Sequence, residues 1–581
     1  MRTKRLHCIL LALLVFAPWS SLLAQGAAET NSTLRIEFNV RVPLPGSGGV
    51  ELSADVYRPA ADGKYPVILF RTPYNKNSAG PLRVGRYFAG RDYVVVYMDV
   101  RGRGDSGGEF VPYRNDGRDG YDAIEWCASQ PWSSGNVGTL GGSYLGRIQW
   151  LAALEQPPHL KAMIPLVTPS DPFVEWPTGQ PLPMDISWHH YTSGHVSQNM
   201  DAVDWAQVHW HLPLLTMDKL IGRDLPHWRE SVEHAQLEAF WEPLRYQNKF
   251  DQLAVPALHI SGWYDDEQIG TPLNFIGMTT EAKTPEARRS QKLLMGMWPH
   301  ATNSTTKLVD IEFGPDAKID LDGYELRWFD YWLKGIDNGI MSEPPVRVFV
   351  MGDNLWRNEN EWPLARTQWT KYYLHSSGKA NSRLGDGMLS MTIPGKENPD
   401  VYQYDPANPT TFITDASFAQ IGSADDYQEV EKRDDLLVYS TPELTADVEM
   451  TGPIKVHLFA ASSAKDTDFM AMLLDVWPNG YVQRLCDGMI RARFRNGMDK
   501  PELIEPGKVY EYVIDCWNTS QVFKRGHRIR LQIASSAFPK YDRNLNTGEP
   551  MGKSTNMMVA TQRIFHDRQH PSHALLPIIP R

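Results

Sequence analysis

A short glycine-rich stretch around Ser143 constrains the fold of this 581-residue chain more than any other feature. The segment 136–140 before it is short, apolar and typical of a β-strand, and the segment 144–154 after it carries apolar residues at helical spacing. A strand that turns sharply into a helix brings two backbones close together, so small residues are needed beside the serine: two glycines before it and Gly146 after it. The stretch therefore predicts an elbow that presents Ser143 as a nucleophile.

The motif departs at one position from the general G-x-S-x-G elbow. Leu145 stands where the second glycine is expected, and Gly146 follows one residue later. Taken alone, the stretch also fits a glycine-rich turn ahead of an ordinary helix. The assignment of Ser143 therefore depends on partners elsewhere in the chain.

Continuous apolar runs on both sides of the elbow predict a parallel sheet covered by helices. These runs lie at 66–70, 93–98, 162–167, 257–260 and 292–295. Two segments with alternating polarity, from Leu34 and from Val50, precede them and are typical of antiparallel edge strands. Strands that alternate with helical segments form a parallel sheet with right-handed crossovers. We therefore predict an α/β fold, with an α/β-hydrolase domain formed by residues 33–169 and 251–340.

Two other regions have a different character. Residues 170–250 contain six of the nineteen tryptophans and seven histidines, and we expect them to form a helical cap over a pocket. Most of these tryptophans should pack in the core, while one or two line the pocket. Residues 345–581 show short strands separated by turn residues, which predicts a C-terminal all-β jelly-roll sandwich.

The first 24 residues have the pattern of a signal peptide. Three basic residues precede the apolar segment 8–17, and Leu22-Leu23-Ala24 offers a cleavage site. The alternative is an uncleaved membrane anchor, but Pro18 and Trp19 interrupt the apolar run well short of the about 20 residues that a membrane span needs. We therefore expect export to the periplasm or beyond it, without stable membrane insertion.

Composition excludes several kinds of partner. The net charge is −11, and no basic stripe with interleaved aromatic residues is present, so we expect no nucleic-acid partner. The cap histidines lack an H-E-x-x-H motif or a set completed by carboxylates, so we predict no metal site and no cofactor. Cys486 and Cys516 either pair or remain buried thiols, and the sequence leaves open whether the chain forms a homo-oligomer.

Two later segments supply partners for Ser143 in the chain order of an α/β-hydrolase, with the acid before the histidine. Asp265 follows the predicted strand 257–260, and His300 follows the predicted strand 292–295. Both residues stand where a strand ends and a loop begins, which is where ligands and chemistry concentrate in such sheets. Order and spacing predict a triad in which His300 takes the proton of Ser143 and Asp265 orients the imidazole.

A tetrahedral intermediate on Ser143 would need two hydrogen-bond donors for its oxyanion. The backbone N–H of Tyr144, directly after the nucleophile, is one candidate. The other should come from the loop after the third strand, which reads Arg-Thr-Pro-Tyr-Asn-Lys at 71–76. The hydroxyl of Tyr74 in that loop can donate as a backbone amide would.

Together these residues resemble the CocE/NonD group of serine hydrolases, whose nucleophile motif is G-x-S-Y-x-G, so Leu145 is no defect within it. The resemblance places the oxyanion tyrosine on Tyr74 in Thr-Pro-Tyr-Asn-Lys, the acid on Asp265 in Trp-Tyr-Asp and the histidine on His300 in Trp-Pro-His. Matching segments also lie at 99–108, 327–335 and 526–536. The group includes cocaine esterase, α-amino-acid ester hydrolases and glutaryl-7-aminocephalosporanic acid acylases. It implies three domains and hydrolysis of small acyl esters or amides through an acyl-enzyme.

The resemblance leaves the substrate open. The amino-acid ester hydrolases of the group bind the substrate ammonium with a carboxylate cluster, two members of which closely follow the catalytic acid. Here Glu267 fits that pattern, but Gln268 stands where the second acid is expected. Glu175 and Asp171 are the candidates for the third acid.

Other features leave further alternatives. Trp263 and Trp298, which lie just before the acid and the histidine, are additional candidates for substrate contacts. An X-Pro-type dipeptidyl-peptidase would use the same chemistry but would need sites for a peptide amine and a proline. A carbohydrate-binding or adhesion protein with an inactive hydrolase domain is a third interpretation, and the intact candidate triad argues against it.

Overall fold

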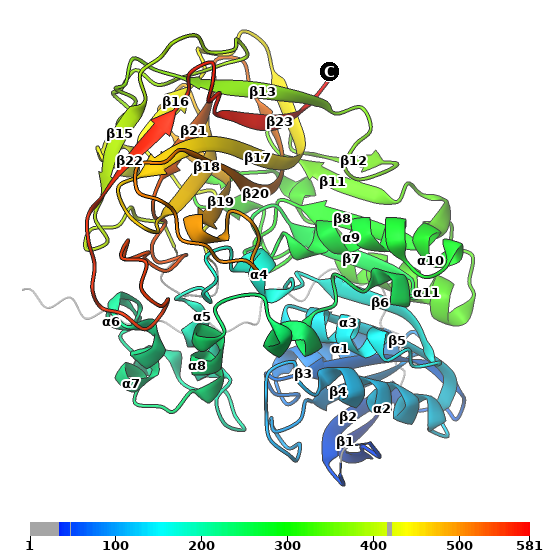
Figure 1. The fold of residues 1–581 in the computed structure, drawn as a ribbon. Coiled ribbons are helices and arrows are strands. Elements are labelled where there is room, and N and C mark those ends of the chain that lie inside the picture. The colour runs from blue at the N-terminus through cyan, green and yellow to red at the C-terminus, as the bar shows by residue number, and fades with distance from the viewer. Residues whose placement is uncertain (1–33, 47, 415–420) are drawn as a thin grey trace, which may run out of the picture.

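The computed structural model describes residues 34–46, 48–414 and 421–581, which form an α/β part, a helical cap and a β domain (Figure 1). The predicted signal peptide lies outside the described residues. No helix in the described ranges combines the length and the apolar character that a membrane span requires.

A ten-stranded sheet forms the centre of the α/β part. Its strands, in order across the sheet, are β1 (Leu34–Pro43), β2 (Glu51–Pro59), β4 (Val94–Asp99), β3 (Tyr65–Thr72), β5 (Ser133–Gly142), β6 (Leu160–Leu166), β7 (Ala257–Gly262), β8 (Gln291–Gly296), β11 (Val346–Val350) and β12 (Leu355–Glu359). The strands from β4 to β11 pair in parallel, whereas β1, β2 and β12 are antiparallel at the two edges. The predicted parallel sheet and its antiparallel first edge are confirmed.

Helices cover both faces of this sheet, which is why its central strands are continuous apolar runs. They are α1 (Ala79–Ala89), α2 (Asp116–Ser129), α3 (Tyr144–Leu154), α9 (Gly270–Glu281), α10 (Pro285–Arg289) and α11 (Leu321–Lys334). On one face, α1 and α11 meet through the rings of Phe88 and Phe329, whose centroids are 6.2 Å apart. Helix α11 ends at Gly335, which adopts the left-handed conformation that stops a helix. A two-stranded ribbon, β9 (Lys307–Leu308) with β10 (Ile311–Glu312), lies between β8 and α11 in the chain.

The predicted cap is inserted between β6 and β7. Its α-helices are α4 (Pro172–Glu175), α5 (Asp185–Tyr191), α6 (Trp205–Trp210), α7 (Met217–Ile221) and α8 (Pro226–Glu233). Trp205 and Trp228 pack with apolar neighbours in a small core of the cap itself. The cap also lies against the β domain (Figure 1), where the guanidinium of Arg543 donates to the carbonyl of Trp210 at 2.7 Å.

The C-terminal β domain is mainly antiparallel, as predicted for a β-sandwich. Its strands are β13 (Gln368–His375), β14 (Met388–Ser390), β15 (Asp400–Tyr404), β16 (Leu437–Ser440), β17 (Val448–Ser462), β18 (Asp468–Val476), β19 (Val482–Arg491), β20 (Tyr510–Phe523), β21 (Arg528–Ala534), β22 (Ala560–Phe565) and β23 (His573–Ile579). Cys486 and Cys516 lie in this domain as buried free thiols. Of the two alternatives, a disulfide or two buried thiols, the structure therefore shows the second.

The expected start of the β domain at residue 345 needs correction. Strand β11 pairs in parallel with β8, and β12 continues the same sheet, so both belong to the α/β part. An apolar run such as Val346–Val350 fits either a buried parallel strand or a sandwich strand, so its pattern alone could not assign it.

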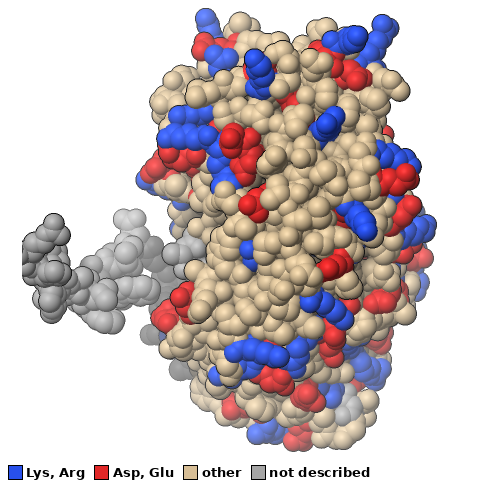
Figure 2. All heavy atoms as spheres, turned by 60° about the vertical axis from the view of Figure 1, so that its left-hand side comes forward, with Lys and Arg blue, Asp and Glu red and all other residues tan. Residues whose placement is uncertain are grey.

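The face of the molecule seen in Figure 2 carries interspersed charges of both signs.

Candidate active site

Ser143 stands between the end of β5 and the start of α3, at φ 59° and ψ −129°. A positive φ is strained for a residue with a side chain and persists where the surrounding structure enforces it. Here the N–H of Ser143 donates to the carbonyls of Leu166 (3.0 Å) and Val167 (3.1 Å) at the end of β6. These bonds fix the elbow against the neighbouring strand.

The shift of the second glycine from position 145 to position 146 has a steric reason. A Cβ on Gly146 would lie 2.5 Å from the hydroxyl of Thr168 and 2.8 Å from the carbonyl of Leu166, so this position cannot carry a side chain. A Cβ on Gly141 would lie 2.5 Å from the Cβ of Leu145. The missing side chain at Gly141 therefore makes room for a leucine where the general elbow has glycine.

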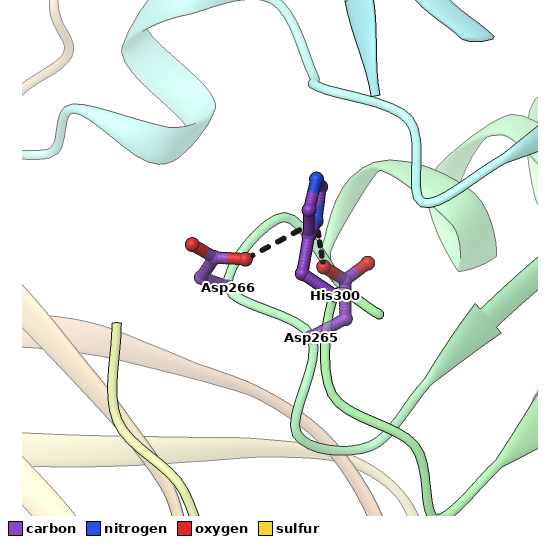
Figure 3. Close-up of side chains that lie close together, drawn as sticks. All are labelled: Asp265, Asp266 and His300. Atoms are coloured by element: carbon purple, nitrogen blue, oxygen red, sulfur yellow. Dashed lines mark hydrogen bonds and ion pairs between the residues drawn. The ribbon is translucent and has the colours of Figure 1, made fainter. Parts of the chain in front are cut away.

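Asp265 and His300 meet at the carboxyl ends of β7 and β8 (Figure 3). The Nδ1 atom of His300 lies 2.8 Å from Oδ1 of Asp265. The other oxygen of Asp265 accepts a hydrogen bond from the hydroxyl of Ser261 at 2.6 Å, and the N–H of Glu267 donates to Oδ1 at 3.2 Å. Burial raises the pKa of Asp265, and the hydrogen bond with His300 opposes that effect. Ser261 was not among the predicted site residues.

The loop that carries Asp265 is held by the β domain. The hydroxyl of Tyr264 donates to the carbonyl of Arg484 at 2.9 Å. The side-chain amide of Gln268 donates to the carbonyl of Asn518 at 2.6 Å and accepts the N–H of the same residue at 3.1 Å. An ionised acid could not donate to that carbonyl, which explains the amide where the resemblance leads one to expect a carboxylate.

Ser143 and His300 line one cavity of about 580 Å³, roofed in part by the cap. Its wall includes Tyr74, Tyr113, Arg114, Arg147, Glu175, Trp176, Leu182, Met184, Asp185, Trp188, Tyr191, Phe240, Trp241, Asp266 and Glu267. Three cap tryptophans reach the cavity, one more than predicted. The lining is largely aromatic and apolar with a few acidic and basic groups, which is usual for a site that holds a small molecule.

Tyr74 lies in this wall with its hydroxyl close to Ser143. The hydroxyl accepts a hydrogen bond from the indole N–H of Trp188 at 3.0 Å, so its own proton remains available. Burial raises the pKa of Tyr74, while its hydrogen bonds with Trp188 and Ser143 oppose that effect. At neutral pH the group is therefore a neutral donor. Trp188 was not singled out by the sequence, which showed it only as one of six cap tryptophans.

Tyr144 turns its side chain away from this role. Its hydroxyl donates to Asp116 at 2.5 Å, and its ring stacks on Tyr113 with centroids 4.4 Å apart. The backbone N–H of Tyr144 lies in the first turn of α3, where amides have no carbonyl one turn earlier in the helix. Any role as an oxyanion donor would thus belong to the backbone.

Five carboxyl groups border the cavity: Glu175, Asp185, Glu230, Asp266 and Glu267. Burial raises the pKa of Glu175 to about 8 and that of Asp185 to about 7, and it raises the pKa of Glu267 well above its usual range. One oxygen of Glu267 is buried without a hydrogen-bond partner. Asp185 and Asp266 were not predicted, and only the position of Asp266, directly after Asp265, could have indicated it.

The two candidates for a third acid separate clearly. Glu175 lines the cavity and accepts the N–H of Ser170 at 2.6 Å. Asp171 accepts the N–H of Tyr246 at 3.0 Å and lies 3.4 Å from the guanidinium of Arg245, so it holds the base of the cap together.

The structure corrects the expectation for Trp263 and Trp298. Both side chains are buried in the main hydrophobic core. The indole of Trp263 donates to the carbonyl of Phe349, and that of Trp298 donates to the carbonyl of Ala317, each at 2.7 Å. Both indoles therefore fix the two loops from behind, because the side chains at these loop starts point into the core rather than toward the cavity.

Within the described ranges, one group of three side chains could hold a metal ion: Asp265, Asp266 and His300, whose ligand atoms lie within 4.8 Å of one another. The same geometry is that of an imidazole N–H placed between two carboxylates.

Comparisons with known proteins show what this chain is similar to. The sequence profile of the X-Pro dipeptidyl-peptidase (S15) family matches residues 48–302, and that of the X-Pro dipeptidyl-peptidase C-terminal non-catalytic domain matches residues 338–574. A cocaine esterase of Rhodococcus sp. (strain MB1 Bresler) is 38% identical, over 94% of this chain and 99% of the relative. A putative serine esterase of Mycobacterium bovis is 26% identical, over 91% of this chain and 94% of the relative.

Solved structures show the same fold over the whole chain. An α-amino acid ester hydrolase matches with a TM-score of 0.83 and 24% identity, covering 97% of this chain and 100% of that one. An aminopeptidase from a marine sediment archaeon, Thaumarchaeota archaeon, matches with a TM-score of 0.81 and 24% identity, covering 97% and 99%.

Fold and relatives together define a serine hydrolase built from an α/β-hydrolase domain, an inserted cap and a C-terminal β domain. The chain belongs to the CocE/NonD family of serine hydrolases, related to the X-Pro dipeptidyl-peptidases.

Proposed function

We propose that this enzyme hydrolyses small acyl esters or amides through an acyl-enzyme on Ser143, with His300 and Asp265 completing the triad. One observation carries the proposal. A serine on a strained elbow, a buried tyrosine hydroxyl and a histidine paired with a carboxylate converge on a single cavity of about 580 Å³.

In this mechanism Oγ of Ser143 attacks the acyl carbon while its proton passes to Nε2 of His300. The opposite nitrogen of His300, Nδ1, donates a hydrogen bond to Oδ1 of Asp265 at 2.8 Å, which keeps the proton on Nδ1. The oxyanion is stabilised by the hydroxyl of Tyr74 and the backbone N–H of Tyr144. His300 then protonates the departing alcohol or amine. In the second half of the reaction His300 deprotonates a water molecule that attacks the acyl carbon, the bond to Oγ breaks, and His300 returns the proton to Ser143 as the acid leaves.

A narrower substrate class, esters that carry a positively charged amine, is favoured by one feature of the cavity. Glu267 has a buried oxygen without a hydrogen-bond partner, and Glu175 borders the same space. A bound ammonium group could pair with the free oxygen of Glu267 and favour the ionised form of both carboxyl groups, and the aromatic wall would hold the apolar part of such a substrate.

The decisive experiment is active-site labelling combined with turnover of p-nitrophenyl esters. The wild-type protein should react with a fluorophosphonate probe and hydrolyse the esters, and Ser143→Ala should lose both properties. An unlabelled wild-type protein would favour an inactive binding protein instead. Release of Xaa-Pro from chromogenic anilides, at rates above those for the esters, would favour a dipeptidyl-peptidase.

A panel of matched esters with and without a free amino group tests the narrower class. If the carboxyl groups recognise a cation, the amino esters should have the lower KM, and Glu267→Gln should reduce that preference. Equal KM values for both sets would limit the proposal to acyl esters in general.

Export remains a proposal that rests on the signal-peptide pattern of residues 1–24.

A further inference from the structure

A second carboxylate approaches the same nitrogen of His300 as Asp265 does. Oδ1 of Asp266 lies 3.3 Å from Nδ1, against 2.8 Å for Oδ1 of Asp265. Figure 3 shows the two carboxylates on either side of the imidazole. Two acids at one N–H are more than is needed to fix a tautomer, since a single hydrogen bond does that.

The two acids have different surroundings. The side chain of Asp265 is fully buried and is held by Ser261 and the backbone of Glu267 as well as by His300. The side chain of Asp266 is 15% exposed and borders the cavity, and its buried Oδ1 makes no hydrogen bond. The contact of Asp266 with the imidazole is thus an ion pair, and it strengthens when the ring carries a positive charge.

Several other groups face this pair and set its balance. Glu267 and Tyr74, in the cavity wall, interact electrostatically with His300, and Asp185 of the cap interacts electrostatically with Asp266. From the β domain, Lys540 acts on Asp266, although its ammonium is bound to Asp487 at 2.6 Å.

These contributions give His300 an unusual charge preference. Burial alone would lower the pKa of His300, but Asp266 and Asp265 outweigh burial and raise that pKa well above its ordinary value. Asp266 shows the opposite effect: burial raises its pKa, but His300 outweighs burial and lowers it. Both directions say that the pair favours its charged form.

We propose that Asp266 is a positioning residue for the hydrolase reaction, a second acid that stabilises the imidazolium of His300 while the proton of Ser143 resides on it. This inference rests on the proposed function of Ser143. Asp265 orients the ring through a hydrogen bond, and Asp266 adds negative charge from the cavity side.

The test is the pH dependence of kcat/KM for an uncharged p-nitrophenyl ester. Only neutral His300 accepts the serine proton, so activity rises with pH through its pKa. Removing the Asp266 charge in Asp266→Asn should move that rise to lower pH by about 1 unit and reduce the plateau of kcat by ~10-fold. Asp266→Glu, which keeps the charge, should return the rise toward its wild-type position.

Two further variants make the result specific. Glu230→Gln removes a negative charge from the rim of the same cavity, where Glu230 pairs with His227, and should leave the rise in place. Asp265→Asn should instead lower kcat by ~10³-fold to 10⁴-fold, because it removes the group that orients the ring.

An unshifted pH profile in folded Asp266→Asn would overturn the inference, whether or not KM changes. A raised KM confined to cationic esters would make Asp266 a substrate-binding residue instead. If Asp266→Asn does not fold, Asp266→Ser is measured in the same way, and its unshifted profile counts equally against the inference. Full activity in Ser143→Ala would be a different failure, because it would remove the proposed function itself.

Discussion

In the described part of the chain, two places bring a serine, a histidine and two carboxylates together. One is the cavity site of Ser143 and His300. The other lies in the β domain, where Nδ1 of His566 is 3.0 Å from Glu397, Nε2 is 2.9 Å from Asp400, and Nε2 is also 3.2 Å from Oγ of Ser376. Judged by residue types and distances alone, the second cluster would also be assigned as a catalytic triad.

The hydrogen bonds of the second cluster show why it is structural. Both nitrogens of His566 face carboxylates, so the ring acts as a double donor and has no lone pair for a serine proton. The hydroxyl of Ser376 donates to Asp400 at 2.8 Å, and the side chain of His566 is fully buried. At His300, by contrast, both acids lie at Nδ1, and the ring borders a cavity. In a catalytic histidine the acids lie at one ring nitrogen, so the other nitrogen can accept a proton on the substrate side.

The largest effect that separates the two clusters is expected from removing each histidine. His300→Ala should lower ester turnover by ~10⁴-fold or more, because the base is lost. His566→Ala should leave turnover near the wild-type value but reduce the free energy of unfolding by ~3–5 kcal/mol, since Asp400 and Glu397 lose their buried partner. Turnover and urea denaturation measured on both variants check this. A large loss of turnover in a folded His566→Ala protein would contradict the structural assignment.

A smaller effect is expected from the tyrosine beside each cluster. Tyr74→Phe removes the proposed oxyanion donor and should lower kcat by ~10²-fold to 10³-fold. Tyr439, whose hydroxyl donates to Asp400 at 2.7 Å, is the matched control. Tyr439→Phe should leave kcat unchanged and cost about 1 kcal/mol of unfolding free energy for one lost hydrogen bond. Equal kcat values for Tyr74→Phe and the wild type would remove Tyr74 from the mechanism.

The same contrast shows what the sequence could predict. The parallel sheet, the elbow and the order of Ser143, Asp265 and His300 follow from local patterns, because each strand end is read from its own apolar run. Tyr74 could be named from the loop after the third strand and from the family pattern, whereas Glu175 was one of two candidates for a third acid. Their places in the cavity wall come from the structure.

Other features had no local signal. Trp263 and Trp298 each stand two residues before a site residue, but both lie in the loops after β7 and β8, where the alternation of a strand no longer predicts direction, and both point into the core. The sequence of helix α2 shows no clear helical pattern, because Gly117, Gly120 and three aspartates interrupt the apolar stripe along it. Asp185 reaches the cavity only through the fold of the cap, and the assignment of Val346–Val350 depended on its pairing with β8.

The smallest expected effect concerns pH. As pH rises, the stabilisation from the His566 cluster should decline, whereas ester turnover at the His300 site should increase. Burial lowers the pKa of His566, but Asp400 and Glu397 outweigh burial and raise it. Burial raises the pKa of Asp400, but the hydrogen bonds from His566, Ala380, Tyr439 and Ser376 together outweigh burial and lower it. A raised histidine pKa contributes stability that is complete below its unfolded value and is lost as pH rises through the folded value. A lowered aspartate pKa contributes stability that is complete above its unfolded value and is lost as pH falls through the folded value.

The stabilisation from His566 and Asp400 should therefore be complete between about pH 4 and 6.5 and decline on either side. The difference in urea midpoint between the wild type and His566→Gln, measured from pH 4 to 9, should be largest in that window. Ester turnover should rise over the upper part of the same range, because His300 becomes neutral and can accept the serine proton. If the midpoint difference grew with pH instead, His566 would not be held as the charged partner of its two acids. One of its nitrogens could then carry a lone pair, and the ring could accept a serine proton.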